Sequence, residues 1–153
     1  MEAGRPKRVL MLCYYYPPLS SAGTHRGVGF TRWLGEFGWL PVVLTVGNSR
    51  IRWEPRCEQV PEHVQVVRSY EWNLLGVLTL LTGVINRLRD LVRLPRRPSA
   101  IYAWCLPDVQ IAWLSTIRGA LLARTCDCIY VSCSPFSSAL SVCLIKVATR
   151  RPL

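Results

Sequence analysis

The sequence predicts an α/β fold built on an incomplete, doubly wound parallel sheet. Four short runs of apolar residues are separated by longer segments, and most of these segments repeat their apolar residues at helical spacing. The runs carry little polar alternation, which is typical of strands buried on both faces. No hairpin turn joins one run to the next. We therefore expect parallel pairing in the order 3-2-1-4, with helices on both faces.

Composition and charge limit the class of protein. The chain has 153 residues, of which 50% are hydrophobic and 18% are charged, so a single domain with a sizeable core is expected. The formal net charge is +10, and nearly all of the 19 basic residues are arginine. Such a surface suits phosphate groups, anionic lipid or nucleic acid. No interleaving of aromatic and basic residues typical of nucleic-acid modules is present, so no nucleic-acid partner is expected.

Seven cysteines are scattered through apolar segments, and the first residues do not form a secretory signal. Together these features predict a cytoplasmic protein with free thiols. The triplet Cys126, Cys128 and Cys133 could suggest a metal site, but the spacing is not that of a zinc knuckle and no histidine lies near in the sequence. Buried small apolar side chains explain them better. We expect no metal and no cofactor.

The first apolar run, residues 9–16, predicts a buried strand that Pro17-Pro18 ends. A loop of small residues follows from Ser20 to Gly23. Thr24 is the expected cap of the next helix, whose first turn carries Arg26. Strand, small loop and helix start together form the kind of site that binds anions. A plain turn that needs small residues only for packing explains the same pattern equally well. The apolar residues at helical spacing here are Val28, Phe30, Trp33, Leu34 and Phe37.

The later strands are expected at residues 42–46, 64–68 and 128–132. Asp108 is a candidate cap for a helix over residues 109–124, and Ser137 or Ser138 for a final helix to about Thr149. In the first of these helices the expected inward residues are Ile111, Leu114, Ile117, Leu121 and Leu122. A second small-residue loop, Ser134–Ser138, follows the last strand. In an open parallel sheet, ligands bind where such loops meet.

A longer helix is expected from Trp72 to Leu94. Its apolar stripe consists of Leu74, Leu78, Leu81, Ile85, Leu88 and Val92. The uncharged front is too short to span a bilayer. A basic flank follows, made of Arg87, Arg89, Arg93, Arg96 and Arg97. An apolar face beside a basic flank is typical of a helix on an anionic membrane surface. A core-packing helix with a solvated charged end is the alternative.

Several motifs occur together in a familiar order. They are Tyr16-Pro17-Pro18, Gly23-x-x-Arg26, Gly38-Trp39-x-Pro41-x-Val43-Leu44-Thr45, Trp104-x-x-Pro107-Asp108 and Ser134-Pro135-x-Ser137-Ser138. In this order and spacing, which cover nearly the whole chain, the sequence resembles the amino-terminal domain of family 4 glycosyltransferases. The resemblance implies a Rossmann-like domain that forms half of a GT-B architecture.

The resemblance also implies an activity: transfer of a sugar from a nucleotide-sugar donor to a glycan or lipid-linked acceptor. The domain would shape the acceptor side, and its first loop would approach the donor phosphates. The implied phosphate-binding loop consists of Ser20, Ser21, Gly23 and Arg26, and the second cleft loop of Ser134, Ser137 and Ser138. Ser20 and Ser21 stand where relatives usually have paired glycines.

Ala139 stands where relatives often have histidine, so no catalytic residue is assigned. The chain also stops before a second, nucleotide-holding domain, which predicts a truncated enzyme that is inactive alone. The second hypothesis is a non-catalytic α/β module that binds a partner or associates with a membrane surface through residues 74–97. Either protein would be cytoplasmic, and either fits the inner face of the membrane.

Overall fold

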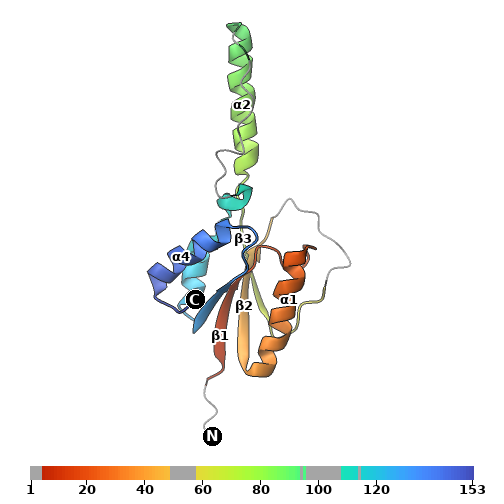
Figure 1. Cartoon of the computed structure of the whole chain (residues 1–153), viewed down its shortest axis with the longest axis vertical. Coiled ribbons are helices and arrows are strands. Elements are labelled where there is room, and N and C mark those ends of the chain that lie inside the picture. The colour runs from red at the N-terminus through yellow and green to blue at the C-terminus, as the bar shows by residue number, and fades with distance from the viewer. Residues whose placement is uncertain (1–4, 49–57, 94, 96–107, 114) are drawn as a thin grey trace.

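The computed structural model describes residues 5–48, 58–93, 95, 108–113 and 115–153 (Figure 1). The strands are β1 (Lys7–Leu12), β2 (Trp39–Val46), β3 (Gln65–Ser69) and β4 (Cys128–Val131). The α-helices are α1 (Ala22–Leu34), α2 (Leu74–Leu91), α3 (Ser115–Ala123) and α4 (Ser137–Thr149). Two short 3-10 helices are η1 (Gly35–Phe37) and η3 (Val109–Ala112).

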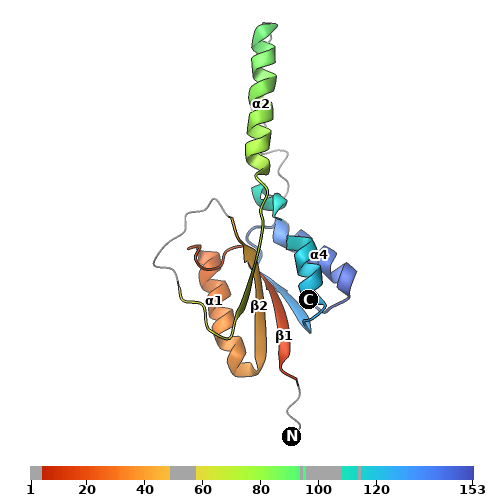
Figure 2. The ribbon, with the colours of Figure 1, turned by 180° about the vertical axis from the view of Figure 1, so that it is seen from behind.

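The four strands form one parallel sheet in the order β3-β2-β1-β4, which confirms the predicted topology. Leu10 is opposite Val42 on one side and Ile129 on the other. Helix α1 covers one face, whereas α3 and α4 cover the other (Figures 1 and 2). From β1 the chain runs through α1 to β2 on one side and then to β3 at the edge. It returns later to form β4 on the other side of β1. The strand order therefore reverses between β1 and β4, which makes this the switch point of the sheet.

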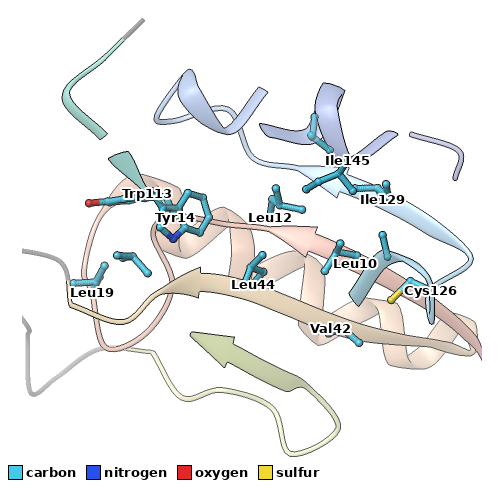
Figure 3. Packing of buried hydrophobic residues seen from close by; sticks show 13 residues of the cluster. Leu10, Leu12, Tyr14, Leu19, Val42, Leu44, Trp113, Cys126, Ile129 and Ile145 are labelled. Atoms are coloured by element: carbon cyan, nitrogen blue, oxygen red, sulfur yellow. The ribbon is translucent and has the colours of Figure 1, made fainter. Parts of the chain in front are cut away.

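The core has two layers, one on each side of the sheet. Alternate residues of β1 point to opposite faces, so Val9 and Met11 pack toward α1, and Leu10 and Leu12 pack toward α3 and α4. Figure 3 shows the second layer, where Leu44 of β2 and Ile145 of α4 are fully buried. Burial on both faces explains why the strand sequences show continuous apolar runs.

Helix α1 buries only part of the predicted apolar stripe, in which Val28 is buried and Leu34 is partly buried. The buried residues are Thr24, Gly27, Val28 and Thr31. In contrast, Phe30, Trp33 and Phe37 are exposed. The reason is the ring of Tyr16, which is fully buried beneath the helix and whose hydroxyl oxygen lies 2.9 Å from Thr31 Oγ1. A Cβ on Gly27 would lie 3.2 Å from that ring, so only small side chains fit there.

The predicted helix over residues 109–124 is interrupted. Helix η3 ends at Ala112, Trp113 has extended backbone, and α3 begins at Ser115. The expected inward residues Ile117 and Leu121 are exposed, and Leu114 lies outside the described residues. Instead the buried residues of α3 are Ser115, Gly119 and Ala123. Small residues face inward because α3 lies close against α4.

Helix α2 does not join the core. It begins just after β3 and projects away from the sheet as a separate arm (Figures 1 and 2). Asn73 caps it, because the side-chain oxygen of Asn73 accepts a 2.7 Å hydrogen bond from Gly76 N. The large apolar residues on one face of the arm remain exposed. In the described residues, therefore, nothing supports the core-packing interpretation of this helix.

The described cysteines are all free. Cys13 and Cys126 are buried, Cys128 is partly buried, and Cys133 and Cys143 are exposed. Burial raises the pKa of the Cys13 thiol to about 12, so this group stays protonated and apolar. Among the residues the structure describes, no group of three metal-ligating side chains comes together. Cys126 is part of one core layer, and the partly buried Cys128 packs against the other.

Candidate functional site

The candidate site is the carboxyl edge of the sheet, where the loops after β1 and β4 begin. Cys13 N donates to Leu44 O and Ser132 N donates to Leu12 O, both at 3.0 Å, so the two loops leave from neighbouring positions. Ligands of open α/β sheets bind outside the carboxyl ends of the strands at such a switch point. The structure therefore brings the two sequence-predicted loops to the same edge, although they lie far apart in the chain.

The first loop ends in a well-formed helix start. Ser21 has extended backbone, and its Oγ accepts a 3.3 Å hydrogen bond from Thr24 N. Ser21, rather than the predicted Thr24, is thus the cap of α1. Thr24 is buried in the first turn and donates its hydroxyl to Leu19 O at 2.8 Å. The amides at the start of a helix have no acceptor within the helix, and Ala22 and Gly23 are in that position. Ser20, just before the cap, is exposed.

Gly23 is explained by packing. A Cβ at this position would lie 3.1 Å from Cδ2 and 3.3 Å from Cβ of Tyr15. The backbone of Gly23 is helical, so the residue is not needed for a left-handed conformation. The absence of a side chain lets α1 start directly against Tyr15. This contact agrees with the plain-turn interpretation, in which the loop needs small residues for packing.

Arg26 is exposed and lies just past the first turn of α1, because the helix begins at Ala22 and not at the predicted Thr24. Burial raises the pKa of Tyr130 in β4, while the nearby Arg26 guanidinium acts in the opposite direction. Arg26 also lines an apolar hollow of about 490 Å³, together with Phe30 and Trp33. The adjacent His25 pairs with the carboxylate of Glu58. Arg26 is therefore an exposed cation on α1, close enough to Tyr130 of β4 to act against the rise of its pKa.

The second loop differs from its prediction in one respect. Ser134 is exposed, whereas Ser137 and Ser138 are buried at the start of α4. Neither serine side chain caps the helix, and within the described part of the chain their Oγ atoms have no hydrogen-bond partner. Instead Asp108 Oδ2 accepts a 2.8 Å hydrogen bond from Ser137 N. A carboxylate at the positive end of a helix is favourable, so Asp108 already occupies the anion position of α4.

Asp108 links two elements. Its Oδ1 also accepts a 3.1 Å hydrogen bond from Gln110 N, so the same carboxylate caps both η3 and α4. The sequence identified Asp108 as a cap for the first of these helices only. The bond to α4 comes from a residue 29 positions away, and no local pattern indicates such a contact. Trp104 and Pro107, which belong to the same motif, lie outside the described residues.

An acidic and aromatic group, made of Tyr15, Glu71 and Asp108, lies at this edge, and the sequence did not predict it as a site. Glu71 follows β3, and its carboxylate accepts a 2.7 Å hydrogen bond from the buried Tyr14 hydroxyl. Asn48 holds Glu71 through two hydrogen bonds to its backbone, of 2.7 and 2.9 Å. Burial raises the pKa of Tyr15, and the carboxylates of Asp108 and Glu71 raise it further. The position of Glu71 directly after a strand was the available signal.

This group suits a ligand rich in hydroxyl groups. Carboxylates accept hydrogen bonds, and the phenol of Tyr15, which is protonated at neutral pH like any tyrosine, is a donor. The ring of Tyr14 packs edge-on against Trp113 at 5.3 Å, and the indole of Trp113 donates to Ser69 Oγ at 2.6 Å. These contacts hold the wall of the site rigid.

Comparison with known proteins adds no assignment: no family model, curated protein or solved structure matches the chain at a significant level. Over the described residues, no helix combines the length and the hydropathy needed to cross a membrane. The predicted basic flank lies partly on α2, which carries Arg87, Arg89 and Arg93 at or near its far end. Arg96 and Arg97 lie outside the described residues.

Proposed function

We propose that this chain is the acceptor-side, amino-terminal part of a glycosyltransferase. The reaction would move a sugar from a nucleotide-sugar donor to a glycan or lipid-linked acceptor. One observation carries the proposal: the loops of two motif segments, each resembling family 4 glycosyltransferases, leave the sheet side by side at its switch point. A fold shared with an enzyme family does not by itself indicate a reaction. The position of the two motif loops where ligands bind in such sheets is what supports this one.

The donor side of the proposed site is the start of α1. The amides of Ala22 and Gly23 and the guanidinium of Arg26 would face the phosphates of the donor. Ser20 and Ser21 complete this loop. In the reaction the bond between sugar and phosphate breaks, so a positive charge here would stabilise the leaving phosphate.

The acceptor side would be formed by the loop after β4 and by the acidic and aromatic group. Ser134 is exposed beside the loop, and Tyr15, Glu71 and Asp108 supply donors and acceptors for sugar hydroxyl groups. Ser137 and Ser138 contribute to the shape of the wall. No general base is assigned, because Ala139 offers no titratable group.

The described residues supply groups on one side of a reacting sugar only. Efficient transfer needs positioned groups around the reacting atom and exclusion of water. We therefore expect residues 1–153 to bind donors weakly and not to transfer sugar without a second, nucleotide-holding domain. The protein would work in the cytoplasm at the inner face of the membrane.

A non-catalytic α/β module is the second candidate function. The observation in its favour is α2, whose exposed apolar face is a contact surface that the transfer reaction does not require. Such a module would show no preference for nucleotide sugars at the carboxyl edge of its sheet.

Donor binding separates the two candidates. UDP-, GDP- and dTDP-sugars are titrated into the 153-residue chain and followed by NMR, and we expect dissociation constants on the order of 1 mM for the preferred donor. Arg26→Ala should abolish saturable binding of the donor. Arg32 is an exposed arginine elsewhere on α1, so Arg32→Ala should leave donor binding unchanged. Equal binding by wild type and Arg26→Ala, or no binding by any nucleotide sugar, would reject the proposed donor site.

A further inference from the structure

Helix α2 exposes a continuous apolar face to solvent. Eight large apolar side chains along it are each at least 51% exposed, and Leu91 reaches 83%. At 1.5 Å per residue, its 18 residues extend about 27 Å. The eight side chains are Val77, Leu80, Leu81, Val84, Ile85, Leu88, Leu91 and Val92. Isolated exposed apolar residues are common on proteins, but a row of this length marks a contact surface.

The apolar side chains lie on one side of the helix. At 3.6 residues per turn, all eight fall within an arc of about 140°. Thr79, Asn86 and Asp90 fall on the opposite side. Thr82 and Asn86 are only partly exposed, whereas the apolar side chains are more exposed than these polar ones. A helix in contact with water on all sides does not usually carry an apolar arc of this width.

Charge on α2 indicates what covers the apolar face. No charged residue occurs from Leu74 to Asn86. Arg87 then lies about 20° beyond one edge of the apolar arc, and Arg89 about 40° beyond the other. A helix lying in a membrane surface has this arrangement, because the arginines reach phosphate groups while the apolar arc enters the acyl boundary. A second copy of a chain with net charge +10 would instead be repelled.

Two exposed aromatic residues precede α2 in the chain. Tyr70 and Trp72 lie between β3 and the helix, and both side chains are more than 60% exposed. Tyr and Trp side chains favour the boundary between water and lipid because they combine an apolar ring with a polar group. The root of α2 is therefore compatible with the same environment as the arm.

We propose that the apolar face of α2 docks onto an anionic phospholipid surface, with Arg87 and Arg89 contacting lipid phosphates at its two edges. The helix would lie in the plane of the surface, since no described helix combines the length and the hydropathy needed to span a membrane. Because α2 starts beside the carboxyl edge of the sheet, docking brings the candidate site close to the lipid headgroups (Figure 1). The docking itself does not depend on sugar transfer.

Cosedimentation with vesicles tests this proposal. The 153-residue chain is mixed with vesicles of phosphatidylcholine alone or with about 30% phosphatidylglycerol, in low and high salt. We expect binding to the anionic vesicles, weakened by salt. Leu81→Ser/Ile85→Ser should reduce it at least tenfold. The matched control is Ile117→Ser/Leu121→Ser, an exposed apolar pair with the same spacing on α3, which should bind like wild type.

A second pair of substitutions, which removes two charges, tests the role of the arginines. Arg87→Gln/Arg89→Gln should weaken binding to anionic vesicles about 30-fold and remove most of the salt dependence. Arg118→Gln/Arg124→Gln, two exposed arginines on or beside α3, should bind like wild type. Circular dichroism checks that every variant is folded. Equal binding to both vesicle types, or no binding to either, would overturn the proposal. So would a dimer in sedimentation equilibrium that Leu81→Ser/Ile85→Ser dissociates, which would assign the face to a second copy.

Discussion

Gly119 marks the closest approach between α3 and its surroundings. A Cβ added there would lie 2.4 Å from Ile145 Cδ1 and 3.5 Å from Leu44 Cδ2. Ile145 and Leu44 are both fully buried, so neither side chain moves without disturbing the core. Gly29, on the outer part of α1, has no such neighbour within 4 Å. The two glycines therefore differ in packing although both are helical.

This difference gives the first prediction at the residue scale. Gly119→Ala should lower the free energy of unfolding by about 1–2 kcal/mol, because overpacking outweighs the gain in helix propensity. Gly29→Ala should raise it by about 0.5–1 kcal/mol. Urea unfolding measures both. In a double-mutant cycle, Ile145→Val removes Cδ1 and should make the cost of Gly119→Ala smaller than in the wild type. If the effects of the two substitutions on stability simply add, the contact with Ile145 Cδ1 is not the cause of the loss of stability in Gly119→Ala.

Between elements, Asp108 is the central polar contact. Its two carboxylate oxygens cap η3 and α4, which are separated in the chain by α3 and β4. The cap therefore connects the beginning of one helical segment with the beginning of another at the carboxyl edge of the sheet. It also explains why Ser137 and Ser138 are not needed as caps.

Removing this cap is the prediction at the element scale. Asp108→Ala should destabilise the protein by about 1–2 kcal/mol, because two backbone donors lose their acceptor. Asp108→Asn should cost less, since its amide keeps one oxygen acceptor. The exposed Glu62→Ala is the control and should change stability by no more than about 0.5 kcal/mol. If Asp108→Ala is as stable as that control in urea, the bond to Ser137 has no structural importance.

At the scale of the whole molecule, the sheet edge offers one wall and α2 extends beyond it. The described groups of that wall face solvent, where a single cation stabilises a leaving phosphate far less than in a closed cleft. If a nucleotide-holding domain closed the site, Arg26 would therefore stabilise the leaving phosphate much more strongly.

The corresponding prediction compares transfer by two proteins. Residues 1–153 alone should show no transfer from a radiolabelled donor. In a protein that carries the same residues together with a nucleotide-holding domain, Arg26→Ala should reduce turnover by ~10²–10³, the effect of losing one preorganised donor at the transition state. Arg32→Ala should not. Robust transfer by residues 1–153, or a fully active Arg26→Ala enzyme, would contradict the proposed role.

Sequence and structure agree best for the strands. The runs that contain Leu10, Val43 and Ile129 are apolar throughout because both faces of the sheet are covered, and this burial is visible in composition alone. Agreement is poorer for the helices. Phe30 and Ile117 fit an apolar stripe yet are exposed, because rings and close helix contacts leave room only for small residues. The space available to a helix side chain is set by the element packed against the helix, so the helix sequence alone does not show it.

Apolar runs and charge patterns in the chain were therefore enough to predict the strands, their parallel order and the apolar and basic character of α2. The buried helix faces, the capping of α4 by Asp108 and the projection of α2 from the carboxyl edge became known from the folded chain (Figure 2). A strand buried on both faces must be apolar throughout, and a helix repeats its apolar residues at a fixed spacing, so both features are visible in a short stretch of sequence. Caps and close packing arise between residues far apart in the chain, and their partners are set only when the sheet brings them together.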